Sequence, residues 1–220
     1  MNWPNESEEY RSARDELLRA EIALRRQEEA VAAQRRALPL GGEVTEDYVF
    51  DGVDGPVRMS ELFGDKDMLY LYNFMYRPGE KGLTLEGPCP SCTSIIDGVD
   101  GAARHLTQTV ALAVIAKVPM ERFRAWGDER GWRFARLLSS ANNTYNRDYL
   151  AEDENEMQRP VASVFTKRDG AIHHFWSSEL LAAPTEPGEH PRHVDYMWPF
   201  WKMLDSTPEG RTVSEPKLEY

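Results

Sequence analysis

The stretches MLYLYNFM at residues 68–75 and CPSC at residues 89–92 decide how this chain is expected to fold. The first is almost continuous in apolar and aromatic residues, which is typical of a central strand covered on both faces. The second opens a segment, reaching about residue 106, that is expected to be helical. Pro90 fits the first helical position, where a missing N–H costs nothing. We therefore expect a strand, then a cysteine pair, then a helix.

The two cysteines are the most informative residues of the chain, because it has only two and both lie in one CxxC motif. Unpaired N–H groups and the helix dipole stabilise an anion at the first turn, which favours the thiolate of Cys89. Cys92, three residues later, returns to the same side and can attack a mixed disulfide formed at Cys89. The spacing predicts a redox-active pair with Cys89 as nucleophile and Cys92 as resolving thiol, supported by Pro90 and Ser91.

A metal site is the first alternative for such a pair. A structural zinc site needs four ligands, usually two CxxC pairs or one pair with two histidines. The sequence has no second CxxC, and its histidines at 173–174, 190 and 193 do not follow the order of a zinc finger. We expect no metal and no cofactor. Two inert buried cysteines remain a second alternative.

Composition limits the partners. The net charge of −11 disfavours nucleic acids and anionic membranes, since both are negatively charged. The longest apolar runs are far shorter than the roughly 20 residues that span a bilayer. The first residues lack the basic and apolar pattern of a secretory signal, so we expect a cytoplasmic protein. Thiols are kept reduced there, which argues against a structural disulfide.

Residues 6–38 are expected to form one long helix, ended by Pro39 and two glycines. Apolar and small residues recur at alternating steps of three and four, which is a heptad pattern. We expect residues 1–40 to form a helical arm and residues 41–220 to form the folded domain. The arm either lies on its own domain or pairs with a second copy, and we predict a homodimer with contacts through residues 6–38.

Alternating α and β segments follow the arm. A short strand near Val49, a turn over residues 51–56, and strands within residues 68–75, 109–116 and 134–139 are expected, separated by helices. A hairpin across residues 167–170 and a C-terminal aromatic helix complete the order. The polar segments 77–88 and 140–159 are expected to be loops, and the tail beyond Thr207 to be loose. The fold class predicted is an α/β three-layer sandwich, with a central mixed sheet and helices on both faces.

This order, together with strand–CxxC–helix and the hairpin starting at Pro160, resembles the thioredoxin superfamily. The resemblance implies that Pro160 is a cis-proline that lies against the cysteine pair and belongs to the site. More closely, the chain resembles an uncharacterised bacterial family described as predicted dithiol–disulfide oxidoreductases, related to alkyl hydroperoxide reductases and thiol-specific antioxidant proteins. The motifs that carry this resemblance are RRALPLGG, EDYVFDG, PCPSC and the tail segment Thr207-Pro208-Glu209-Gly210-Arg211.

One departure from thioredoxins concerns proton transfer. Thioredoxins keep a buried aspartate on the strand before the cysteines, whereas YNFMY places Asn73 there. An amide cannot take a proton, so assisted deprotonation of Cys92 is in doubt.

Three functions stay open at this point. The first is a thiol–disulfide oxidoreductase acting on a protein disulfide or a small thiol. The second is a peroxiredoxin-like peroxidase that uses Cys92 with Arg159. The missing threonine of the peroxiredoxin Thr-x-x-Cys motif counts against it. The third is a non-enzymatic redox sensor whose helical arm recruits a partner.

Overall fold

The computed structural model describes residues 2–77 and 87–219. The chain divides into two compact units, Met1–Leu40 and Gly41–Tyr220. Residues 78–86, the middle of the loop expected at 77–88, lie outside the described part.

The first unit is built on one helix, α1 (Glu8–Arg36). Ser7 begins it, because its side chain accepts a hydrogen bond from the N–H of Tyr10 at 3.1 Å. Acidic residues occupy the first turn and basic residues the last, which suits the helix dipole. No residue of α1 is buried. Leu17 and Leu24, both in the heptad pattern, are 48% and 58% exposed.

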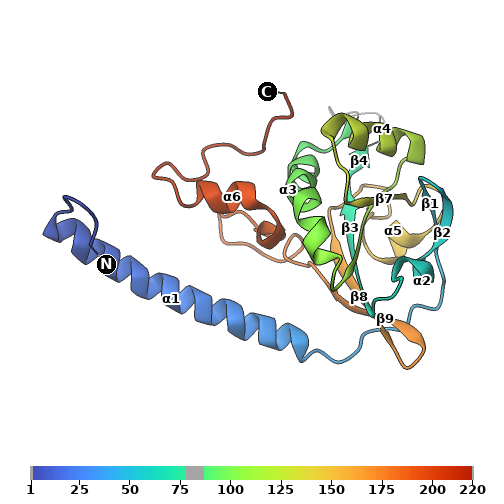
Figure 1. The fold of residues 1–220 in the computed structure, drawn as a ribbon, viewed down its shortest axis with the longest axis horizontal. Coiled ribbons are helices and arrows are strands. Elements are labelled where there is room, and N and C mark those ends of the chain that lie inside the picture. The colour runs from blue at the N-terminus through green and yellow to red at the C-terminus, as the bar shows by residue number, and fades with distance from the viewer. Residues whose placement is uncertain (1, 78–86, 220) are drawn as a thin grey trace. The chain divides into compact units, whose positions relative to one another are not determined.

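The second unit contains the remaining elements, shown in Figure 1. The strands are β1 (Val49–Gly52), β2 (Gly55–Arg58), β3 (Met68–Phe74), β4 (Tyr76–Arg77), β5 (Gly87–Pro88), β6 (Ala111–Ala116), β7 (Arg136–Ser139), β8 (Ala162–Arg168) and β9 (Ala171–Ser177). The helices are α2 (Met59–Leu62), α3 (Pro90–Leu106), α4 (Met120–Arg130), α5 (Tyr145–Asp148) and α6 (Pro199–Leu204), with a 3₁₀ turn at Asp195–Met197.

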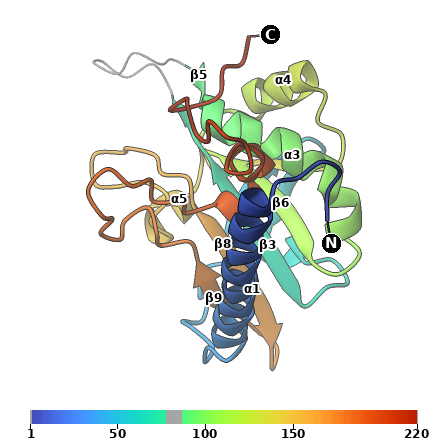
Figure 2. The ribbon, with the colours of Figure 1, turned by 90° about the vertical axis from the view of Figure 1, so that its left-hand side faces the viewer.

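A seven-stranded mixed sheet in the order β2-β1-β7-β6-β3-β8-β9 forms the middle layer. Strand β3 is parallel to β6 on one side and antiparallel to β8 on the other. The strands β6, β3, β8 and β9 follow one another across the sheet in Figure 2. Strands β4 and β5 pair separately. This topology confirms the predicted thioredoxin-like α/β sandwich.

The two faces of the sheet are covered by different helices (Figure 1). One core joins Tyr72 and Phe74 of β3 to residues of α3, α4 and α6. The other joins Leu69 and Leu71 of the same strand to residues of α2 and α5. Side chains alternate along a strand, so an apolar run of this kind supplies both cores at once.

Three local predictions were wrong. Residues 51–56 do not form only a turn, because β1 and β2 pair across them as a hairpin. The loop predicted at 140–159 contains the short helix α5. The tail beyond Thr207 is held, since the Arg211 guanidinium bonds to Asp205 at 2.7 Å and to Asp195. These carboxylates fix the tail at Arg211.

Helix α3 is braced by a buried carboxylate. The oxygens of Asp100, 7% exposed, accept backbone N–H groups of Arg133, Phe134 and Ala135 at 2.8–3.1 Å. These bonds satisfy the three N–H groups that directly precede β7 and tie this part of the chain to α3. The position of α3 therefore depends on Asp100. Within residues 2–77 and 87–219, no helix has the length and apolarity needed to cross a membrane.

We predict that Asp100→Asn lowers the free energy of unfolding by about 2 kcal/mol, because a buried group with three N–H donors loses its charge. Urea unfolding followed by circular dichroism measures it. Asp128→Asn is the matched control, since its ion pair with Arg124 is exposed and is expected to contribute below about 0.5 kcal/mol. Equal losses in the two variants would contradict this role of Asp100.

Candidate functional site

The cysteine pair lies at the start of α3, next to the end of β3. The N–H of Cys89 donates to the carbonyl of Met75 at 3.0 Å, just beyond the end of β3. Cys89 is the N-cap of α3, and Pro90 occupies its first turn as predicted. Cys89 is half-buried and Cys92 is 1% exposed, and no disulfide joins them.

The sulfur of Cys89 is the hydrogen-bond acceptor that caps the N-terminus of α3. It accepts the N–H of Cys92 at 3.5 Å, so the thiol occupies the place that a Ser or Asp side chain takes at other helix starts. A helix start favours negative charge, and this helix has 17 residues with no acidic residue in its first turn. The geometry therefore suits a thiolate at Cys89.

A second layer of bonds fixes the backbone of this first turn. The carbonyl of Cys89 accepts both the N–H and the hydroxyl of Thr93, each at 2.9 Å. The indole N–H of Trp126 on α4 in turn donates to the Thr93 hydroxyl at 3.2 Å. The Trp198 indole N–H donates to Ser94 at 3.0 Å. Residues of α3 and α4, together with Trp198 just before α6, thus hold the turn that carries the cysteines.

Tyr72 is a site residue that the sequence analysis missed. Its hydroxyl, fully buried, donates to the sulfur of Cys92 at 3.4 Å. A tyrosine hydroxyl on a strand buried on both faces must find a polar partner, and this requirement was the available signal. Burial, followed by the charge of Cys92, raises the pKa of Tyr72 well above its ordinary value. Tyr72 therefore stays a hydrogen-bond donor.

The electrostatics distinguish the two thiols. Burial raises the pKa of Cys92 well above the ordinary thiol value, and the hydrogen bond and charge of Cys89 raise it further. The hydrogen bond from Tyr72 and the backbone of Met75 act in the opposite direction. Cys92 is consequently held as a thiol beneath the more accessible Cys89.

Asn73 does not lie with the cysteines. Its neighbours in the strand alternate between the two cores, and Asn73 falls on the face of Leu69 and Leu71. There its amide N–H donates to Asn146 Oδ1 at 3.2 Å. The side chain that contacts Cys92 from β3 is therefore that of Tyr72 and not that of Asn73.

The Arg159–Pro160 peptide bond is trans, so the expected cis-proline was wrong. Backbone bonds on both sides are satisfied with this isomer. The N–H of Arg159 bonds to the carbonyl of Ala151 at 2.7 Å, and the carbonyl of Val161 accepts the N–H of Asn73 at 2.8 Å. Trans is the usual isomer of an X–Pro peptide bond, and the two backbone hydrogen bonds are compatible with it. Pro160 still precedes β8 beside the end of β3.

Arg159 points to a different environment from the one expected. Its guanidinium is 47% exposed and lies 3.6 Å from the carboxylate of Asp153. It lines a cavity to which neither cysteine contributes. The structure thus gives Arg159 an acidic partner instead of the sulfur of Cys92. Ser91 is half-buried in the first turn of α3, between the cysteines.

The chain belongs to the family described as "Bacterial protein of unknown function (DUF899)", whose model matches residues 2–220. This membership agrees with the resemblance to a bacterial family. No curated protein sequence matches the chain.

Solved structures give weaker likenesses. Peroxidoxin BcpB from Mycobacterium tuberculosis is 16% identical with a TM-score of 0.45, over 76% of this chain and 98% of that one. Thioredoxin peroxidase I from Plasmodium yoelii is 17% identical with a TM-score of 0.44, over 76% and 91%. A hypothetical protein from Sinorhizobium meliloti 1021 is 17% identical with a TM-score of 0.44, over 73% and 81%. At these values the likenesses do not bear on activity.

We predict that iodoacetamide alkylates Cys89 at least 10-fold faster than Cys92 in the native, reduced protein near pH 7.5. Only the thiolate reacts, and the raised pKa of Cys92 keeps that residue protonated to a higher pH than an ordinary thiol. Timed quenching and peptide mass spectrometry measure both rates. In urea the two rates should converge, and faster modification of native Cys92 would contradict the assignment.

Proposed function

We propose that this protein is a thiol–disulfide oxidoreductase in which Cys89 is the nucleophile and Cys92 the resolving thiol. The observation that carries the proposal is the sulfur of Cys89, half-buried at the N-cap of α3, with the buried Cys92 thiol beneath it. A helix start that binds an anion and a second thiol within one turn are the two requirements of dithiol exchange.

The reaction follows from this arrangement. The Cys89 thiolate attacks one sulfur of a substrate disulfide, so that one S–S bond breaks, a mixed disulfide forms and a substrate thiolate leaves. Cys92 then loses its proton to that thiolate or to solvent and attacks the sulfur of Cys89. The second substrate thiol is released, the substrate has gained two electrons, and the cysteine pair is a disulfide. A thiol donor, such as glutathione or a dithiol protein in the expected cytoplasmic setting, restores the pair.

Tyr72 supports the second attack. Its hydroxyl points at the sulfur of Cys92 from the strand side, at 3.4 Å. A hydrogen bond to a charged acceptor is stronger than one to a neutral acceptor, so this contact favours the Cys92 thiolate when it forms. Tyr72 is thereby a positioning residue for the resolving step.

The peroxidase alternative has less support. It requires Cys92 as the peroxide-reacting thiolate beside Arg159. Cys92 is 1% exposed, its pKa is raised, and Arg159 pairs with Asp153. Each of these observations counts against Cys92 as the first residue to react.

We predict that Cys92→Ser, incubated with oxidised glutathione, accumulates a glutathione adduct on Cys89, because the resolving thiol is missing. Cys89→Ser is the matched variant, and its adduct on Cys92 should be at least 10-fold less abundant. Intact-protein mass spectrometry quantifies both.

The reverse trapping pattern would defeat this assignment of roles. A sulfenic acid formed at Cys92 on exposure of the full chain to hydrogen peroxide would instead support the peroxidase. Equal adducts in both variants would show that the two thiols are equivalent, which the proposal also excludes.

We further propose that the helical arm of residues 1–40 joins two copies of the protein. At 29 residues, α1 is about 43 Å long and none of its residues is buried. Leu17 and Leu24 lie one heptad apart, and the surrounding glutamates and arginines can form ion pairs between two helices. A second copy is the partner that matches this mixed charge and spacing.

Light scattering on the full chain tests the dimer. The double variant Leu17→Glu, Leu24→Glu should have half the measured mass, because charges enter the heptad positions that are proposed to form the dimer contact. Leu18→Glu is the control, because Leu18 is 47% exposed but is not one of these heptad positions. The mass of this control variant should equal that of the wild type. Equal, monomeric masses for all three proteins would refute the dimer.

A further inference from the structure

A cavity of about 770 Å³ lies within the second unit, and neither cysteine lines it. Its walls come from the chain before β1, from α5 and the residues after it, from β9 and from the segment after β9. Tyr48, Tyr149 and His174 line it and contact the core on the face opposite α3. A volume of this size suits a small organic molecule.

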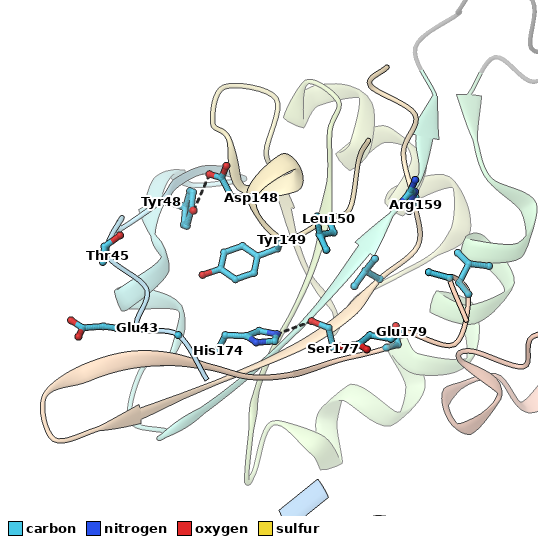
Figure 3. Close-up of a pocket in the computed structure, with 15 residues that line it drawn as sticks. Glu43, Thr45, Tyr48, Asp148, Tyr149, Leu150, Arg159, His174, Ser177 and Glu179 are labelled. Atoms are coloured by element: carbon cyan, nitrogen blue, oxygen red, sulfur yellow. Dashed lines mark hydrogen bonds between the residues drawn. The ribbon is translucent and has the colours of Figure 1, made fainter. Parts of the chain in front are cut away.

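A β-bulge shapes the floor of this cavity. In the pairing of β8 with β9, Val164 faces Trp176 and Phe165 faces His174, so Phe175 is an extra residue. The bulge lets His174 and Ser177 face the same side although they are three positions apart. The ring Nε2 of His174 and the hydroxyl of Ser177 lie 2.8 Å apart, as the dashed line in Figure 3 marks.

Aromatic rings dominate one end of the cavity. Tyr149 lies between Tyr48 and His174 in Figure 3, with ring centroids 6.0 Å and 5.9 Å away. Tyr48 is fixed by the hydrogen bond that its hydroxyl donates to Asp148 at 3.0 Å. Leu150, Val161, Leu181 and Ala182 complete an apolar wall. The faces of tyrosine rings carry negative potential and attract cations.

The charged residues that line the cavity are mostly acidic, although Asp148 also lies 3.8 Å from the guanidinium of Arg147. Glu43, Asp148 and Glu179 line the cavity, against Arg159 as the one Arg or Lys among its lining residues. Arg159 and Glu179 both lie at the end away from Tyr48 in Figure 3. Asp153 is already the partner of Arg159, whereas the charge of Glu179 reaches His174, beside Tyr149. Burial lowers the pKa of His174, so this ring is neutral near pH 7. The field at the aromatic end therefore favours a positive ligand.

We propose that this cavity binds a small organic cation with an apolar body, an amine or quaternary ammonium compound. The cationic head lies against Tyr149 and Tyr48 and is attracted by Glu179 and Asp148. The apolar body contacts Leu150, Val161 and Leu181. This site is separate from the exchange reaction, because no cysteine lines the cavity.

Calorimetric titration of the full chain tests the proposal with three probes of similar shape. Benzyltrimethylammonium should bind with a Kd in the millimolar range or below. Phenylacetate, with the opposite charge, should bind at least 10-fold more weakly, and benzyl alcohol should bind severalfold more weakly. Higher salt should weaken the binding of the cation.

Substitutions locate the binding. Glu179→Gln should weaken the ammonium probe about 5-fold and leave benzyl alcohol unchanged, while Tyr149→Leu should weaken both. Glu129→Gln, an exposed glutamate of α4 away from the cavity, is the matched control. If Tyr149→Leu does not fold, the affinity of Glu179→Gln for the ammonium probe still tests the proposal. Phenylacetate binding as tightly as the cation, no ammonium binding up to about 10 mM, or an unaltered affinity in Glu179→Gln would each overturn the proposal.

Discussion

The hydrogen bond from the N–H of Cys89 to the carbonyl of Met75 is the contact on which the site depends. It joins the residue that follows β3 to the N-cap residue of α3. Strand β3 is itself held from both sides, by β6 and β8. A thiol placed there inherits the rigidity of the sheet and the unpaired N–H groups of the helix start. The same contact sets how deep Cys92 lies, one turn further along the helix.

The two cysteines differ in their chemistry because they differ in burial. Cys89 stays half-exposed and caps the helix, whereas Cys92 is enclosed by aromatic and aliphatic residues with Tyr72 as its hydroxyl partner. Burial stabilises the neutral thiol, and the Tyr72 hydroxyl stabilises the thiolate. These opposing effects on the pKa of Cys92 suit a thiol that stays protonated until a mixed disulfide forms at Cys89. The sheet separates the aromatic cavity on its other face from the cysteine pair, so the cavity can bind a different molecule.

Much of the fold could be predicted from residues 68–106, because a doubly covered strand, a proline and a CxxC leave few arrangements open. The hairpin was also visible, and Asp169-Gly170 adopt the positive φ values of 53° and 84° that its turn requires. The partner of Cys92 was not visible. Which of Tyr72 and Asn73 faces the cysteines depends on which side of the sheet α3 covers, and one residue of register reverses the answer. The cis isomer of Pro160 was implied by the family resemblance alone, and the observed trans isomer is the usual one for an X–Pro bond.

Redox equilibrium of the full chain in graded glutathione buffers tests the central claim most directly. Samples are quenched in acid, alkylated and weighed by mass spectrometry. The account predicts one reversible two-electron transition, in which the loss of both thiols coincides with an intramolecular Cys89–Cys92 disulfide. Thiols that persist at every ratio up to fully oxidised glutathione, or oxidation that stops at a glutathione adduct without closing the pair, would contradict it.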